Sequence, residues 1–363
     1  MKKLNVGFIG LGKVAESHLE GYKEVDQVQV IAGAEVSPER LKYMTQKWGL
    51  RGYSDYREMI AKEKLDIACI LTPPILHREI TETVAERRIH ILCEKPMAVT
   101  LDDARAMISA YEKAGIKFYY GSSFRCLPAC MKAKEIIGRG DIGNVCLMME
   151  TYVGGGGPEN WHDLGPHHYP SGGPGGGGMG IVDHGIHTAD AFQWLSGSDV
   201  EQVFGRGNYS GKTPGTEYVT MLFKNGAIGQ LIYNEVTFPS VTPYEGMFSL
   251  GASWSVSGDL LPPGNWDPQP GSLHIHGDKG ALRIFHYANR LFFIGADRQQ
   301  EVLLLGKSNP GHFGTQMKSF ANSIIRDEDP AVTGQDGLRA LRVILAAYES
   351  QKKKALVSLR DLS

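Results

Sequence analysis

The first third of the chain alternates short apolar runs with amphipathic segments. The apolar runs occupy residues 4–9, 28–34, 66–71, 89–93 and 117–121, and the segments between them have helical periodicity. Runs that are nearly continuous in apolar residues are typical of strands covered on both faces. The pattern therefore predicts repeated βαβ units and a parallel sheet.

Polar residues at the starts of two amphipathic segments support these helices. Ser37 directly precedes Pro38, and Thr100 lies ahead of Asp102 and Asp103. Serine and threonine cap helix N-termini, proline is tolerated in the first turn, and acidic side chains there interact favourably with the helix dipole. We expect a helix to begin at both places.

After about Phe124 the pattern changes to longer alternating runs, which favour antiparallel strands. The first of these strands is expected near 145–153. Asn225 and Gly226 separate two later runs and predict a hairpin turn. This half of the chain is therefore expected to be mainly an antiparallel sheet.

Two helices and one long irregular segment are expected within this second half. The helices cover about 181–195 and 335–351. Residues 236–271 are rich in Pro, Gly and Ser and have little periodicity, so we expect long loops there.

Length and charge narrow the class of protein. A chain of 363 residues exceeds what one hydrophobic core usually organises, so two domains are expected. The formal charge of -2 comes without a long basic run, which argues against nucleic acids and anionic membranes as partners. A small-molecule ligand is expected instead.

The number and spacing of the cysteines and the hydropathy of the chain indicate the cellular compartment. The five cysteines are an odd number without paired spacing, so neither a disulfide framework nor a zinc ribbon is indicated. No apolar segment approaches the roughly 20 residues of a membrane-spanning helix. The short apolar stretch at the start is interrupted by Gly7 and Gly10 and is expected to be a strand, not a signal peptide. We expect a soluble, cytoplasmic protein.

A glycine-rich turn follows the first predicted strand. It begins at Gly10, continues through Gly12, Lys13 and Val14, and ends at Ala15, at the start of a predicted helix. In this context the G-x-G-x-x-A pattern indicates dinucleotide binding, because small residues let the backbone approach a pyrophosphate at the positive end of the helix dipole. The alternative is a tight strand-to-helix turn without a ligand.

An acidic residue at the end of the second strand points to NAD. Glu35 is placed to accept hydrogen bonds from the adenosine ribose and to repel a 2′-phosphate. Arg40, nearby, would partly offset that repulsion, so NADP stays open, as does a solvated loop charge at Glu35.

Two further strands end in residues that carry possible chemistry. Thr72 and Pro73 follow one strand, and Glu94 and Lys95 follow the next, at the sheet edge where open α/β folds bind ligands. Beside a nicotinamide, Lys95 would hydrogen-bond a substrate oxygen and stabilise charge that develops there. The alternative is an ordinary surface lysine.

The predicted helix 181–195 carries a candidate acid–base pair. Asp183 and His187 are four residues apart and would share one helix face. Histidine titrates near neutral pH, and a neighbouring carboxylate would orient its ring and favour its protonated form. The alternative is an Asp cap with a structural histidine.

Taken together, these motifs resemble the Gfo/Idh/MocA family over nearly the entire chain. The resemblance rests on their order and spacing, and it includes Gly10 to Ala15, Thr72 to Pro74 with His77, Glu94 to Pro96, Phe124 and Arg125, the glycines before Asp183, Asp183 to His187, the turn and strand at 277–282, and the terminal helix at 334–350.

The resemblance implies a fold and a reaction. The family comprises mainly NAD(P)-dependent dehydrogenases and reductases of sugars, sugar derivatives and cyclitols. It implies an α/β fold with an N-terminal Rossmann dinucleotide-binding domain, residues 1–124. A C-terminal α/β domain with an open, mainly antiparallel sheet, residues 125–363, would bind substrate and form homodimers or homotetramers. Pro96 would follow a cis peptide bond.

The resemblance also implies roles for individual residues. Lys95, Asp183 and His187 would be catalytic: His187 as general acid/base, Asp183 on the substrate and Lys95 in the substrate crevice. The nicotinamide cofactor would contact Gly10, Gly12, Lys13, Val14, Glu35, Arg40, Thr72, Pro73, His77, Glu94, Lys95 and Arg125.

Three other readings stay open. Some relatives run an internal redox cycle within glycoside cleavage, and a nucleotide fold can serve a non-catalytic sensor. The His-rich stretch 161–168 resembles a set of metal ligands, although its adjacent histidines lack ligand spacing, and no metal site is predicted. Trp254 and Trp266 are assigned no role.

Overall fold

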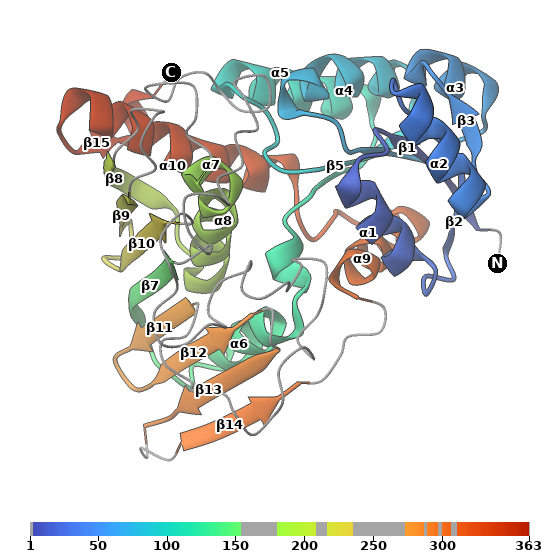
Figure 1. Cartoon of the computed structure of the whole chain (residues 1–363). Coiled ribbons are helices and arrows are strands. Elements are labelled where there is room, and N and C mark those ends of the chain that lie inside the picture. Colours follow the sequence, from blue (N-terminus) through green and yellow to red (C-terminus); the bar gives the residue numbers. More distant parts are fainter. Residues whose placement is uncertain are drawn as a thin grey trace. The chain divides into compact units, whose positions relative to one another are not determined.

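The computed structural model describes residues 3–153, 180–207, 216–234, 273–286, 289–296, 300–305 and 311–362. The chain forms two compact units (Figure 1). The first unit comprises Met1–Ser123 and Asn309–Leu338, and the second comprises Phe124–Ser308 and Arg339–Ser363.

The first unit is built on a parallel sheet with the strand order β3-β2-β1-β4-β5-β6. Its strands are β1 (Leu4–Ile9), β2 (Val28–Ala34), β3 (Arg51–Tyr53), β4 (Ile67–Ile70), β5 (His90–Cys93) and β6 (Phe118–Tyr120). This is the doubly wound order. The strand order reverses between β1 and β4, which leaves a crevice at the carboxyl ends of these two strands. The predicted βαβ units and parallel sheet are confirmed.

Helices cover both faces of this sheet. They are α1 (Lys13–Tyr22), α2 (Pro38–Trp48), α3 (Tyr56–Lys62), α4 (His77–Glu86), α5 (Leu101–Ala114) and α9 (His312–Arg326), with a short 3₁₀ turn, η1 (Pro74–Leu76). Figure 1 shows α4 and α5 on one side of the sheet and α1 and α9 on the other. The Ser37 and Thr100 side chains accept hydrogen bonds from Arg40 N and Asp103 N, which confirms both predicted helix starts.

The last helix of the first unit comes from far along the chain. The sequence assigned 309–338 to the second domain, but these residues belong to the first unit. The reason is a close helix contact: a Cβ atom on Gly21 of α1 would lie 2.7 Å from the backbone nitrogen of Gly314 on α9. Only a glycine lets the two backbones approach this closely.

The second unit contains a nine-stranded open sheet with the order β14-β13-β12-β11-β7-β10-β9-β8-β15. Its strands are β7 (Val145–Val153), β8 (Val200–Gly207), β9 (Glu217–Phe223), β10 (Ile228–Asn234), β11 (Leu273–Gly277), β12 (Ala281–Phe285), β13 (Arg290–Ile294), β14 (Gln300–Leu304) and β15 (Val357–Ser358). β7 and β10 pair in parallel, and the other neighbours are antiparallel. The mainly antiparallel sheet is confirmed, as is the hairpin at Asn225 and Gly226, where Gly226 has a φ of 87°.

The helices of this unit are α6 (Pro128–Gly138), α7 (Gly180–Asp183), α8 (Gly185–Ser196) and most of α10 (Gly334–Lys353). Two short 3₁₀ turns accompany them. η2 (Ser123–Cys126) spans the boundary between the units in the sequence, and η5 (Leu359–Asp361) follows β15. One prediction requires correction. The helix expected over 181–195 is interrupted at His184, which separates α7 from α8. His184 keeps helical backbone angles, with φ -90° and ψ -48°, and its side chain is buried.

Candidate active site

The glycine turn lies at the switch point of the first sheet. Gly10 follows β1 with a φ of 90°, and a Cβ atom there would lie 2.8 Å from the carbonyl oxygen of Leu71. Gly12 is the N-cap of α1, and a Cβ atom on it would meet nothing within 4 Å. Gly10 is therefore required by the fold itself, whereas the space beside Gly12 is open for a ligand.

A cavity of about 510 Å³ adjoins this turn. The predicted residues Gly10, Gly12, Glu35, Thr72 and Pro73 all line it. The hydroxyl of Thr72 is buried and has no hydrogen-bond partner among the described residues. An unsatisfied buried hydroxyl and an uncrowded helix N-terminus both fit a polar, anionic ligand such as a nicotinamide dinucleotide.

Glu35 and Arg40 both form hydrogen bonds with the backbone of the turn. The two carboxylate oxygens of Glu35 accept hydrogen bonds from Leu11 N at 2.9 Å and Ser37 N at 3.0 Å. The Arg40 guanidinium donates to the carbonyl oxygens of Leu11 and Gly12 and forms an ion pair with Glu16. Lys13, also predicted to contact the nucleotide, begins α1 as an exposed side chain, and Val14 follows it.

His77 braces the ends of two strands. Its ring is fully buried, and Nε2 lies 2.8 Å from Thr72 O while Nδ1 lies 3.2 Å from Met97 O. Burial lowers the pKa of His77, which favours the neutral ring. The sequence grouped His77 with the cofactor-binding residues, and its ring contacts the backbone of Thr72, which lines the cavity.

Glu94 anchors the segment that carries Lys95. One oxygen of Glu94 lies 2.9 Å from Nε2 of the fully buried His18, and the other accepts a hydrogen bond from Lys95 N at 3.1 Å. His18 Nδ1 lies 2.9 Å from the Tyr22 hydroxyl. The Lys95–Pro96 peptide bond is cis, as expected. The backbone of Lys95 is thereby tied to helix α1, which begins at the glycine turn.

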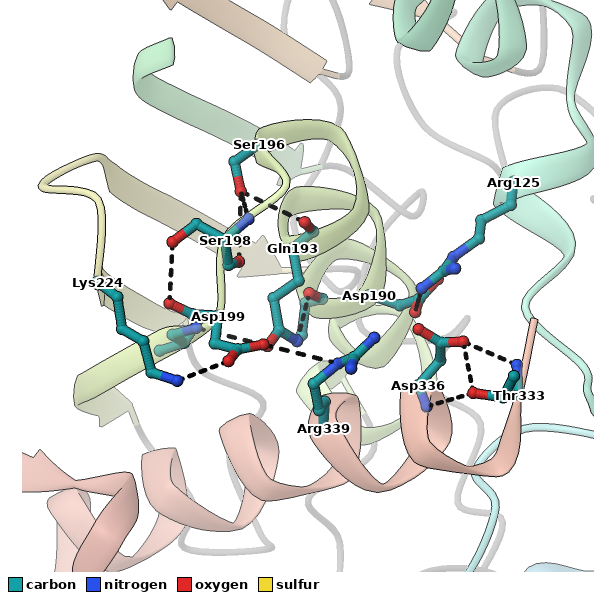
Figure 2. A network of polar contacts seen from close by, with 12 residues as sticks. Arg125, Asp190, Gln193, Ser196, Ser198, Asp199, Lys224, Thr333, Asp336 and Arg339 are labelled. Atoms are coloured by element: carbon teal, nitrogen blue, oxygen red, sulfur yellow. Dashed lines mark hydrogen bonds and ion pairs between the residues drawn. The ribbon is translucent and has the colours of Figure 1, made fainter. Parts of the chain in front are cut away.

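Arg125 lies in the second unit. Figure 2 shows its guanidinium reaching the carboxylate of Asp190 on α8, with Nε donating at 2.8 Å. Both side chains are buried, with exposed fractions of 8% and 2%. A buried, two-pronged pair of this kind fixes η2 against α8.

Asp183 and His187 lie on either side of the helix break, and both are partly exposed. The His187 ring stacks on Phe124, with ring centroids 4.5 Å apart and planes 7° apart. Stacking on Phe124 covers one face of the imidazole and fixes the plane of the ring. The first unit thus holds Lys95 and the cavity residues, while the second holds Arg125, Asp183 and His187.

Several sequence features lie outside the described residues: the His-rich stretch 161–168, Trp254, Trp266, and the glycines at 172–179. The described residues include no group of three or more His, Cys, Asp or Glu side chains arranged to hold a metal ion. None of the helices in the described ranges has the length and apolar composition needed to cross a membrane.

Part of the cavity could not be foreseen from the sequence. Its remaining lining includes the segment 54–57 after β3 and residues Val36 and Glu79. The strand β3 is only three residues long and reads Arg-Gly-Tyr, so neither periodicity nor hydrophobicity signals it. One residue of this segment does have a local sequence signal. Asp55 is a helix cap, and its side chain accepts a hydrogen bond from Arg57 N at the start of α3.

A doubly wound sheet with a glycine turn at its switch point defines the class of dinucleotide-binding proteins. Comparison with known families is consistent with this. Residues 4–122 match the oxidoreductase family with an NAD-binding Rossmann fold, and residues 134–359 match the C-terminal α/β domain of the same family. The chain therefore belongs to the Gfo/Idh/MocA oxidoreductase family.

Individual relatives match over the full length of the chain. A myo-inositol 2-dehydrogenase from Thermotoga maritima is 26% identical over 369 residues, covering 99% of both chains. A D-apiose dehydrogenase from Rhizobium rhizogenes is 28% identical, covering 96% of both. An oxidoreductase from Agrobacterium radiobacter, crystallised with NAD+, L-tartaric acid and magnesium, superposes with a TM-score of 0.81 at 21% identity over the full length of both chains.

Proposed function

We propose that this protein is an NAD-dependent dehydrogenase that transfers a hydride between the nicotinamide and a secondary alcohol or ketone of a sugar, sugar derivative or cyclitol. The cavity at the switch point of the first sheet carries the proposal, because Gly12, Glu35 and Thr72 all line it. The dehydrogenases among the relatives support the substrate class.

The position of Glu35 favours NAD over NADP. A carboxylate at the end of β2 repels a 2′-phosphate and accepts hydrogen bonds from an unmodified ribose. Arg40 would be the counter-charge for a phosphate, but its guanidinium is bound to Glu16 and to two carbonyl oxygens of the turn. Releasing it would cost those hydrogen bonds.

Three side chains carry the proposed chemistry. Bound NAD supplies the hydride acceptor. His187 accepts the hydroxyl proton of the substrate, and Lys95 donates a hydrogen bond to the same oxygen and stabilises its developing negative charge. Asp183 holds a substrate hydroxyl. Reduction follows the reverse path, with His187 as the proton donor.

The proposed function is tested by a substrate panel. Purified protein is mixed with sugars, sugar derivatives and cyclitols together with NAD or NADP, and reduction of the nucleotide is followed by its absorbance. We expect nucleotide reduction with at least one polyol and a larger kcat/KM with NAD. Nucleotide binding without reduction by any member of the panel would favour the sensor.

The residue roles are tested by substitution. Lys95→Ala and His187→Ala should each lower kcat by about 100-fold or more, the size of a lost acid–base or electrostatic contribution. Nucleotide affinity, measured by calorimetry, should change little in His187→Ala. Lys113→Ala, on an exposed position of α5, is the matched control. Near-normal turnover in both variants would contradict the assignment.

We also propose that the second unit forms a homo-oligomer through its sheet. Tyr218 on β9 and Ile232 on β10 are paired across the strands and expose 38% and 39% of their surface, with Ile228 at 40%. An exposed apolar sheet face is typical of an interaction surface. Analytical ultracentrifugation should give a dimer or tetramer for wild type and a smaller species for Ile232→Lys.

A further inference from the structure

One buried carboxylate of the second unit binds two side chains of the helix pair that carries the proposed acid–base residues. Glu150 lies on β7 with 1% of its surface exposed. Its Oε1 lies 2.9 Å from His184 Nε2, and its Oε2 accepts a hydrogen bond from the Thr188 hydroxyl. Both partners are buried as well.

The spacing of the two residues that Glu150 binds determines which neighbouring side chains it orients. His184 and Thr188 are four residues apart, so on a helical path they share one strip of the surface, and Asp183 and His187 form the adjacent strip, rotated by about 100°. A clamp on residues 184 and 188 therefore fixes the direction in which residues 183 and 187 point.

The clamp acts at the joint between α7 and α8. α7 ends at Asp183 and α8 begins at Gly185, and His184 between them keeps helical backbone angles, with φ -90° and ψ -48°. His184 forms the joint, and its ring packs 4.2 Å from that of Tyr152. A second acid, Glu217 on β9, accepts a hydrogen bond from Ile181 N at 3.1 Å, which holds the start of α7.

The energetics also point to a positional role. A buried carboxylate with its hydrogen-bonded partners contributes little net stability compared with apolar residues of similar volume, because desolvation offsets the attraction. Burial alone would raise the pKa of Glu150, but its interactions with His184, His286 and Thr188 outweigh burial and lower it. The carboxylate is thus kept in the form that accepts both hydrogen bonds.

We propose that Glu150 is a positioning residue, which acts through His184 and Thr188 to hold Asp183 and His187 in their reactive directions. This inference rests on the proposed function. It adds to that proposal a residue on a different strand, remote in sequence from the D-x-x-x-H motif.

The test uses substitutions that preserve side-chain volume. Glu150→Gln and Thr188→Val should lower kcat by about 10- to 100-fold, the size expected for a misplacement of the order of 1 Å, with nucleotide affinity unchanged. The control is Phe192→Leu on α8, a fully buried residue that the clamp does not touch. It should lower the melting temperature but leave kcat near the wild-type value.

A double substitution separates positioning from general weakening of the unit. In a His187→Ala background, Glu150→Gln should cause a much smaller further loss of kcat than it causes in the wild-type protein, because only Asp183 is then left for the clamp to position. A multiplicative loss would overturn the inference. His184→Gln, which retains an N–H group toward Glu150, should keep more activity than His184→Leu.

The outcomes also separate this inference from the proposed function. Full turnover in His187→Ala would contradict the function assigned to that residue. An inactive His187→Ala with wild-type kcat in folded Glu150→Gln and Thr188→Val would overturn only the positioning role. If Glu150→Gln does not fold, Thr188→Val and the His184 pair decide the question.

Discussion

At the scale of single residues, the two glycines of the nucleotide turn differ in what they require. Gly10 has a φ of 90° and lies against the backbone of Leu71, so a side chain there is both strained and crowded. Gly12 has a φ of -65°, which any residue adopts, and open space beyond its Cα. The backbone conformation and packing require glycine at position 10, whereas the proposed nucleotide is the reason for glycine at position 12.

Substitution by alanine should separate these two requirements. Gly12→Ala is expected to change the free energy of unfolding by less than about 0.5 kcal/mol while weakening NAD binding by tenfold or more. Gly10→Ala should lower the stability by about 1–3 kcal/mol. Urea unfolding and calorimetric titration with NAD measure both. Wild-type NAD affinity in Gly12→Ala would argue against a pyrophosphate at this turn.

Buried histidines make the stability of the protein sensitive to acid. Burial, together with nearby His18, lowers the pKa of His312 to about 4. The folded protein therefore protonates His312 at a lower pH than the unfolded chain does. The contribution of His312 is complete above about pH 6.5 and is lost as the pH falls toward 4.

A His312→Gln variant tests this contribution. In the wild-type protein, the titration of His312 should make the free energy of unfolding about 2 kcal/mol smaller at pH 5 than at pH 8. Urea unfolding at the two pH values should give a smaller difference for the variant, since glutamine does not titrate. Equal pH dependence in the two proteins would show that His312 is not a buried neutral histidine.

At the scale of elements, the contact between α1 and α9 depends on glycine. Gly21 and Gly314 allow the backbones of the two helices to approach closely. Because α1 begins at the nucleotide turn and also carries His18, this contact supports two parts of the proposed site.

Gly21→Ala should therefore destabilise the first unit by about 1–3 kcal/mol, despite the better helix propensity of alanine. Gly138→Ala, at the end of α6, is the control, because a Cβ atom there would meet nothing within 4 Å. It should be neutral or stabilising by up to about 1 kcal/mol. Equal effects of the two substitutions in thermal unfolding would exclude the steric explanation.

The elements also show how far sequence reasoning reaches. Strands such as 28–34 could be predicted because they are covered on both faces, and the helix starts at Ser37 and Thr100 because their caps are local. The contact of His184 with Glu150 could not, because the two residues lie 34 positions apart in the sequence. The return of 309–338 to the first unit likewise depends on a contact between distant glycines.

For the candidate site, local motifs were sufficient for part of the prediction. Gly10, Gly12, Glu35, Thr72 and Pro73 do line one cavity. The roles of His18 and Glu150 were not predicted, because a buried polar residue in an amphipathic segment has no local signature. Only the tertiary structure shows that each lies within hydrogen-bond distance of a distant partner, Glu94 for His18 and His184 for Glu150.

At the scale of the whole molecule, the central claim is that one chain binds the nicotinamide nucleotide and passes a hydride between it and a polyol. The first unit holds the nucleotide cavity and Lys95, and the second holds Asp183 and His187. Activity should therefore require both units within the same protein, even though nucleotide affinity depends mainly on the first.

The most direct measurement follows the transferred hydrogen itself. A substrate found in the panel is prepared with deuterium on the reacting carbon and incubated with NAD, and the nucleotide and sugar products are analysed by mass spectrometry. The account predicts one deuterium in the reduced nucleotide and a ketone product that lacks it. Deuterium that stays in, or returns to, the sugar product without net nucleotide reduction would contradict a simple dehydrogenase.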